Sequence, residues 1–345
     1  MLLWSGFITL ILFFLALDLG VFHRKNHVVG IKEALSWTAV WATLSLCFSL
    51  FVYFAYEHQW FELGTVIDAV DGKVNTGASA AGKYLAGYLV EQSLSVDNLF
   101  VIAVIFGSFG VPAIYRHRVL FWGIIGALIM RGAMIGIGAQ LIARFHWLLY
   151  VFGGILVLTS IKMVMTNTAT SDPSVNIVVR LVRKYLPVTD HYHGQHFLVR
   201  HETRKTWMLT PLAIALLMVE TTDLIFAVDS IPAIFAITAD PFIAFTSNIF
   251  AILGLRSLFF ALAGMLDKFH YLKYSLAAIL FIVGAKMFVQ SQLQQLVGDY
   301  FNLYLLLVVF AILAIGVAAS FLRKGSSKDA DARAQSLTDA KDSSK

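Results

Sequence analysis

A pair of acidic residues occurs twice in this sequence, each time inside a long apolar stretch. The two carboxylates lie six positions apart and a valine precedes the second: Glu91 and Asp97 in one copy, Asp223 and Asp229 in the other. Glu220 adds a fifth acid one helical turn before Asp223. A charged side chain at the centre of a membrane helix costs about 2.5–3.5 kcal/mol, so such residues are usually kept for function. The pattern predicts a pathway for a cation through a membrane.

The composition indicates a helical membrane protein. Hydrophobic residues make up 59% of the 345 residues and charged residues 14%, and the mean hydropathy is +0.76. In soluble proteins about a quarter of the residues are charged. Cys47 is the only cysteine, which rules out an internal disulfide and a zinc site built from several thiolates. Apolar runs of about 20 residues, long enough to cross a bilayer, predict an all-α polytopic fold with nine transmembrane helices at 2–22, 36–56, 82–108, 119–142, 146–165, 207–236, 244–265, 271–290 and 302–321.

The basic residues divide unevenly between the two sides of these predicted spans. Of the 26 Lys and Arg residues, 19 fall in alternate loops, which include 23–35, 166–206 and the tail from Arg323, and only 3 fall on the other side. Because Lys and Arg accumulate in cytoplasmic loops, the N-terminus is predicted outside and the C-terminus in the cytoplasm. The positive charge thus follows the membrane topology, and we expect a lipid bilayer as partner and no nucleic acid.

The acidic pairs belong to a longer internal repeat of three spans. Arg131 corresponds to Arg256, and Lys162 and Lys286 each follow a Phe-His pair by sixteen residues. Since three is odd and the copies join on the cytoplasmic side, the second copy is inverted, as in many secondary transporters. The predicted organisation is two N-terminal helices with an acidic outer loop (1–80), the first repeat (81–165), a basic, histidine-rich cytoplasmic loop (166–206), the second, inverted repeat (207–290), a final helix (291–322) and a disordered tail (323–345).

The spacing within each pair limits how the acids can act together. Six positions along an α-helix rotate by about 240°, so the two acids cannot share a face of an unbroken helix. Either each acid serves a different point of the pathway or the helices are interrupted, and Pro232, which lacks an N–H, predicts an interruption in the second copy. Oxygen ligands without sulfur favour Mg, Ca or Mn over copper or zinc. The predicted metal ligands are Glu91, Asp97, Asn98, Glu220, Asp223, Asp229 and Asn248.

Arg131, Arg256 and Asp18 also lie within predicted spans. Arg131 and Arg256 are predicted to balance the charge of the acids. Each has an acid that could form a structural ion pair with it, Asp97 for the first and Asp229 for the second. Asp18 lies low in the first span, at the predicted cytoplasmic boundary, where a functional and a structural role are both open.

These segments resemble the TerC family of integral membrane proteins and, within it, the Alx branch. The match is carried by Glu91-Gln-Ser-Leu-Ser-Val-Asp97-Asn98, by the run from Val219 to Ala236, by Thr246-Ser247-Asn248 to Arg256, and by Asp18-Leu19. The resemblance implies a bacterial inner-membrane protein linked to manganese export and, in some members, to tellurite resistance and the response to alkaline pH. It also implies that the functional acids are Glu91, Asp97, Glu220, Asp223 and Asp229.

Two functions from different classes fit these features. In the first, a secondary transporter exports a divalent metal, Mn2+ by the resemblance, through a carboxylate-lined midplane site, in exchange for protons or driven by the membrane potential. In the second, a membrane scaffold or accessory protein acts in metal or tellurite stress through the loop 166–206. An enzyme is not expected, because the sequence has no nucleotide-binding loop, triad or HExxH motif, and no resident cofactor is predicted. The choice among Mn2+, Ca2+, Mg2+ and Fe2+, and the oligomeric state, stay open.

Overall fold

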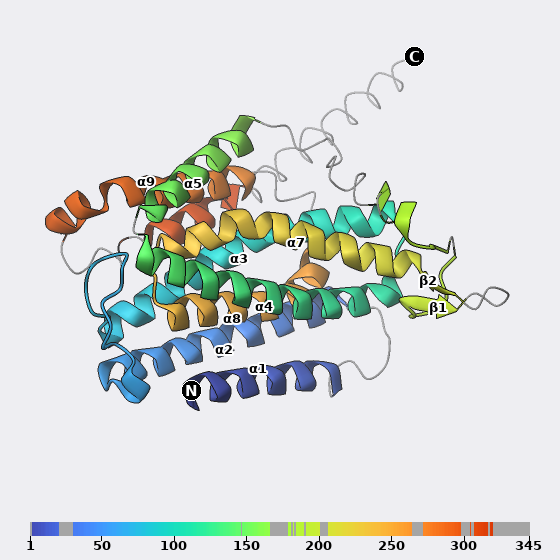
Figure 1. The fold of residues 1–345 in the computed structure, drawn as a ribbon, viewed down its shortest axis with the longest axis horizontal. Coiled ribbons are helices and arrows are strands. Elements are labelled where there is room, and N and C mark those ends of the chain that lie inside the picture. The colour runs from blue at the N-terminus through green and yellow to red at the C-terminus, as the bar shows by residue number, and fades with distance from the viewer. Residues whose placement is uncertain are drawn as a thin grey trace, which may run out of the picture.

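The protein is a bundle of long helices (Figure 1). The computed structural model describes residues 2–20, 30–145, 147–165, 179–180, 182, 184–189, 191–200, 206–263, 272–297, 304, 307–316 and 318–319. Its elements are α1 (Leu2–Gly20), α2 (Ile31–Glu57), η1 (Trp60–Glu62), α3 (Gly77–Ser108), α4 (Ala113–Arg144), α5 (Leu148–Met165), β1 (Leu198–Arg200), β2 (Trp207–Leu209), α7 (Pro211–Phe235), α8 (Pro241–Ala263) and α9 (Leu272–Val297).

Each predicted span coincides with a helix in the described part of the chain. Five helices are long and apolar enough to cross a membrane, namely Ile31–Glu57, Ala113–Arg144, Leu148–Met165, Pro211–Phe235 and Pro241–Ala261. Shorter apolar helices occupy Leu2–Leu17, Tyr274–Val289 and Leu307–Gly316. The all-α, multi-pass membrane architecture is therefore confirmed, while the count of nine spans stays a prediction.

The sixth predicted span begins later than the sequence indicates. Residues 207–209 form β2, which pairs antiparallel with β1, so they are strand and not helix. Helix α7 starts after Thr210, whose hydroxyl accepts a hydrogen bond from the Ala213 N–H. Pro211 occupies the first helical position, where its missing N–H leaves no bond unmade. Hydrophobicity alone cannot separate an apolar strand from the adjoining helix, whereas this capping arrangement can.

The predicted interruption at Pro232 is wrong. Helix α7 continues through Pro232 to Phe235, and α3 is a single helix along its whole length. A proline in the last turn of a helix removes a hydrogen bond where little helix remains to be broken. Asp223 and Asp229 therefore lie on one unbroken helix and must point in different directions.

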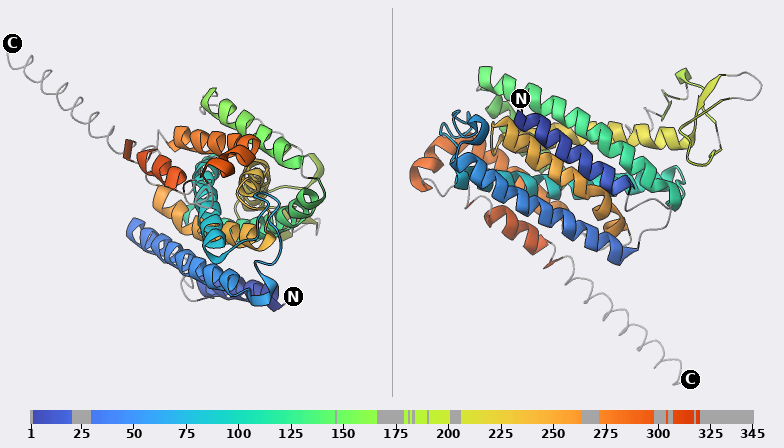
Figure 2. Two further views of the ribbon diagram at one scale, coloured as in Figure 1. Left: turned by 90° about the vertical axis from the view of Figure 1, so that its left-hand side faces the viewer. Right: turned by 90° about the horizontal axis from the view of Figure 1, so that it is seen from below.

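Helices α3, α7 and α8 form the interior of the bundle, which Figure 2 shows end-on. Helix α3 packs against α2, α7 and α8, while α7 packs against α3, α4 and α5. Helices α5 and α9 approach each other closely at two glycines, Gly153 on α5 and Gly284 on α9. A Cβ on Gly284 would lie 3.0 Å from the Gly153 carbonyl oxygen and 2.8 Å from the Leu156 Cβ. Small residues allow this approach, which favours association of helices in a membrane.

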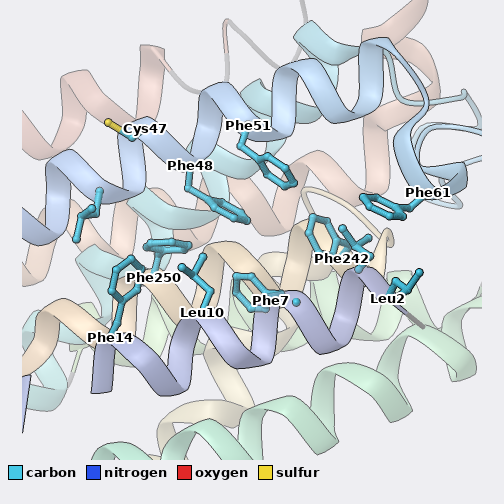
Figure 3. Close-up of a pocket in the computed structure, with 13 residues that line it drawn as sticks. Leu2, Phe7, Leu10, Phe14, Cys47, Phe48, Phe51, Phe61, Phe242 and Phe250 are labelled. Carbon is cyan, nitrogen blue, oxygen red and sulfur yellow. The ribbon is translucent and has the colours of Figure 1, made fainter. Parts of the chain in front are cut away.

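Helix α1 rests on the bundle through aromatic side chains. The ring centroid of Phe7 lies 5.5 Å from that of Phe48, 6.0 Å from Phe242 and 6.3 Å from Phe250. These rings border an apolar crevice of about 440 Å³ between α1, α2 and α8, and the exposed Cys47 also lines it (Figure 3). Rings of this size can hold two helices together while leaving space between their backbones.

A buried polar cluster closes the end of the bundle opposite to β1 and β2 (Figure 1). The Lys83 ammonium donates to Asp68 Oδ2 at 2.8 Å and to Asn75 Oδ1 at 2.6 Å, and lies 2.7 Å from Asp71 Oδ2. Lys83, Asp68 and Asn75 are all buried. The connection between α2 and α3 is thus fixed to α3 by an ion pair shielded from water.

The same cluster reaches the connection between α7 and α8. Asp68 accepts hydrogen bonds from the Thr238 hydroxyl and from the Ala239 N–H, the latter at 2.9 Å. Burial raises the pKa of Asp68, but the Lys83 charge and the hydrogen bonds from Lys83 and Thr238 outweigh it and leave that pKa below its ordinary value. The stabilisation from this ion pair is therefore fully present at neutral pH and is lost only as the pH falls through the lowered pKa.

Replacing Lys83 by alanine should destabilise the protein strongly. Asp68 and Asp71 would stay buried without their cation, which costs about 3–5 kcal/mol. Thermal or denaturant unfolding in detergent measures the loss, and the difference from the wild type should shrink as the pH falls through the pKa of Asp68. Lys73→Ala, at an exposed position of the same connection, should cost less than about 0.5 kcal/mol. Equal losses in the two variants would contradict the assignment.

Candidate functional site

Arg131 on α4 joins the two repeats of the acidic motif. Its guanidinium donates from Nη2 to Asp223 Oδ1 at 2.8 Å and from Nε to Asp223 Oδ2 at 3.3 Å, and from Nη1 to Glu91 Oε1. Nη1 also lies within hydrogen-bond distance, 3.3 Å, of Ser230 Oγ. Arg131 is 0% exposed and Glu91 is 2% exposed. One arginine therefore holds carboxylates from α3 and α7, two segments far apart in the sequence, in the interior of the bundle.

Helix α8 adds an amide to this group. Asn248 donates from Nδ2 to Glu91 Oε2 at 2.9 Å, so both oxygens of the Glu91 carboxylate have donors. The other end of the amide is different: Asn248 Oδ1 is buried and has no hydrogen-bond partner among the described residues. An unsatisfied buried carbonyl oxygen costs about 1–3 kcal/mol. It is a ready ligand for a cation placed beside Glu91.

Glu220 lies one turn before Asp223 and also faces α4. A Cβ on Gly126 would come within 2.0–2.3 Å of its carboxylate, so a larger residue at that position would force the Glu220 carboxylate to move. Residues three apart share one side of a helix. Glu220 and Asp223 thus form a row of two acids that faces α4. Gly126 lies against Glu220, and Arg131 binds Asp223.

Asp229 points to a different neighbour. The Thr159 hydroxyl on α5 donates to Asp229 Oδ1 at 2.8 Å. Asp223 faces α4 and Asp229 faces α5, as the rotation between positions six apart requires. The two acids of the second pair therefore contact different helices, α4 and α5.

The remaining predicted residues are only partly described. Asn98 and Arg256 are buried. The side chains of Asp97 and Asp18 lie outside the described residues, so the predicted pairing of Asp97 with Arg131 is not visible. Within the described part, no three His, Cys, Asp or Glu side chains gather closely enough to hold a metal ion. Arg131 accounts for part of this, because its guanidinium stands between Glu91 and Asp223.

Three residues that position the acids were not predicted from the sequence. Ser230 and Thr159 are hydroxyl neighbours of Arg131 and Asp229, and Gly126 provides the space for Glu220. The sequence could have pointed to Ser230, because it lies seven positions, or two helical turns, after Asp223 and so on the same face of the helix. Thr159 and Gly126 carry none, because they matter only through contact with another helix.

The family model for "Integral membrane protein TerC family" matches residues 76–328, which include every described acid of the site. The chain belongs to the TerC family. Within the family, the chain is similar to the Alx branch. This chain is 42% identical over 320 residues to the "Putative membrane-bound redox modulator Alx" of Escherichia coli (strain K12), and the match covers 91% of this chain and 92% of that protein.

A second relative is closer in sequence than Alx. The "Uncharacterized membrane protein STKORF319" of Myxococcus xanthus is 50% identical over 285 residues, which cover 83% of this chain and 82% of that protein. No solved structure matches the chain. The TerC assignment therefore rests on sequence, and the geometry around Arg131 comes from the present structure.

Replacing Asn248 by leucine, a side chain of similar size, should lower stability. Glu91 Oε2 would lose its donor in a buried position, at a cost of about 1–3 kcal/mol. Ser247→Ala on the same helix is the control, because the Ser247 hydroxyl donates only to the Ala244 carbonyl of its own helix, at 3.2 Å. Unfolding in detergent should show the larger loss for Asn248→Leu. A larger loss for Ser247→Ala would contradict the bond to Glu91.

Proposed function

We propose that this protein is a secondary transporter that exports a divalent metal ion, Mn2+ above others, from the cytoplasm. The observation that carries the proposal is the buried pair of Glu91 and Arg131 with the partly buried Asp223, and beside them an Asn248 oxygen that has no partner among the described residues. Intramembrane charges of this kind mark ion pathways.

The group lies midway along the helices that carry it. Asp223 is twelve residues from each end of α7, since the helix runs from residue 211 to residue 235. Glu91 lies close to the middle of α3. A site near the bilayer midplane, between two repeats, is where secondary transporters bind their substrates and coupling ions.

An inverted repeat agrees with how the helices pack. Helices α4 and α7 run in the same direction, because Gly123, Gly126 and Gly138 approach Val219, Glu220 and Phe235 in that order. Equivalent helices of the two proposed repeats also contact each other, α3 with α7, α4 with α8 and α5 with α9. Nine spans with the N-terminus outside and the C-terminus in the cytoplasm give α4 and α7 this shared direction.

The proposed location is a bacterial inner membrane. The relatives are bacterial membrane proteins, and the basic residues gather on one side of the spans. The choice of Mn2+ rests on the resemblance to the family and on the oxygen-only ligands, which would also accept Ca2+, Mg2+ or Fe2+. Coupling to protons or to the membrane potential is part of the proposal.

The Alx relatives are named for redox modulation. Thiol–disulfide exchange within one chain requires two cysteines, and this chain has Cys47 alone. A redox role by thiol–disulfide exchange within this chain is therefore not proposed. The scaffold alternative would use the segment 166–206, whose described part is docked: the Tyr192 hydroxyl donates to the Phe109 carbonyl at 2.7 Å, and Arg118 donates to Gln195 at 3.2 Å.

Glu91→Gln and Asp223→Asn should each abolish metal export. The substitutions keep side-chain size but remove the negative charge that holds the ion. Efflux of Mn2+ from liposomes containing the purified protein should fall to the rate of empty liposomes. Glu62→Gln, at an exposed position outside the helices of the site, is the matched control and should export at the wild-type rate. A scaffold would move no metal even as wild type, so that outcome would overturn the proposal.

Gly126→Ala should impair export without removing any charge. The new methyl group would displace the Glu220 carboxylate, which lies within 2.3 Å of its position. Loss of one correctly placed metal ligand should reduce apparent affinity about tenfold or more. Gly136→Ala on the same helix is the matched control, because no atom lies within 4 Å of its Cβ. If both variants export at the wild-type affinity, Glu220 is not a ligand.

A further inference from the structure

Arg131 occupies the place that a metal ion would take between the two acids. Its guanidinium donates to Glu91 from α3 and to Asp223 from α7, and it is itself fully buried. The donors use one oxygen of Glu91 and both oxygens of Asp223. A cation cannot bind the same oxygens while these bonds are made, since like charges repel at such short range.

We propose that Arg131 is a tethered cation that replaces the metal ion in the empty transporter and is displaced when the metal binds. The inference rests on the proposed function and goes beyond it, because it assigns a role to the unloaded protein. Two carboxylates left alone in the membrane interior would oppose any movement of the helices that carry them. A guanidinium that follows them removes this obstacle without any ion from solution.

The unbonded oxygen of Asn248 is evidence that a metal ion and Arg131 occupy the space between the acids in turn. Asn248 Oδ1 is buried beside Glu91 and accepts no hydrogen bond in the described structure. Arg131 donates to Glu91, Asp223 and Ser230 and leaves that oxygen unused. A metal ion between the acids would use it. The site thus has one oxygen that the arginine does not bond in this state, which a structural ion pair would have no reason to keep.

When a metal ion displaces Arg131 from the acids, Ser230 can accept a hydrogen bond from its guanidinium. Ser230 Oγ lies 3.3 Å from Arg131 Nη1, on the same face of α7 as Asp223. The guanidinium can keep this hydrogen bond when a metal takes the carboxylates, so it need not be left without a partner. A lysine could not do the same, because its single ammonium cannot bridge two carboxylates with a planar fork of donors.

The role predicts a split between two kinds of transport. Net efflux of Mn2+ requires the empty transporter to return, whereas exchange of Mn2+ for Mn2+ uses only the loaded form. Arg131→Gln should therefore lower the ratio of net efflux to exchange about tenfold or more, since bonds between charged groups change equilibria by at least that factor. The half-saturating Mn2+ concentration for exchange should also fall, because nothing competes for the acids.

Purified protein in liposomes, with the membrane potential held at zero, measures both fluxes with a manganese isotope. Arg131→Lys, which keeps the charge, should give a ratio of net efflux to exchange between those of the wild type and Arg131→Gln. This second variant also decides the matter if Arg131→Gln does not fold. Equal loss of both fluxes in a folded variant, or an unchanged ratio in Arg131→Lys, would overturn the inference and indicate a structural ion pair. A wild type that shows neither flux would instead refute the proposed function.

Discussion

The contact of Arg131 with Glu91 and Asp223 determines how the interior of this protein is arranged. Lipid tails are as apolar as leucine, so apolar faces alone do not decide which membrane helices become neighbours. Charged groups do, because a carboxylate in hydrocarbon must find a partner. Arg131 on α4 binds acids on α3 and α7, and Asn248 adds α8. Four helices are therefore placed by one set of polar contacts.

The second buried cluster, around Lys83, differs in what it joins. It links the connection between α2 and α3 to that between α7 and α8 at one end of the bundle, through Asp68 and Thr238. In the proposed topology this is the outer end, so an ion leaving the central acids outward would meet these tied connections. The central cluster fixes helices to each other, whereas the outer one fixes the links between them.

Much of the fold could be predicted from the sequence, because the length of an apolar run and the 3.6-residue period are local properties. The helices and the different directions of Asp223 and Asp229 follow from them. The partners of Arg131, the docking of Glu220 on Gly126 and the strand at residues 207–209 do not. Each depends on which segments meet in space, and the interruption expected at Pro232 failed because its place in the last turn was not known.

The duplicated sequence has not produced two equal halves. Arg131 binds an acid from each proposed repeat, Lys286 is buried and donates to the Ala236 carbonyl, and its counterpart Lys162 is exposed. Yet Arg256, which corresponds to Arg131, is also buried, on α8. In an inverted repeat the two access states exchange the conformations of the halves. The two arginines would exchange roles as well. In each access state the acids would then have a buried guanidinium within reach, so neither state would leave their charge uncompensated in hydrocarbon.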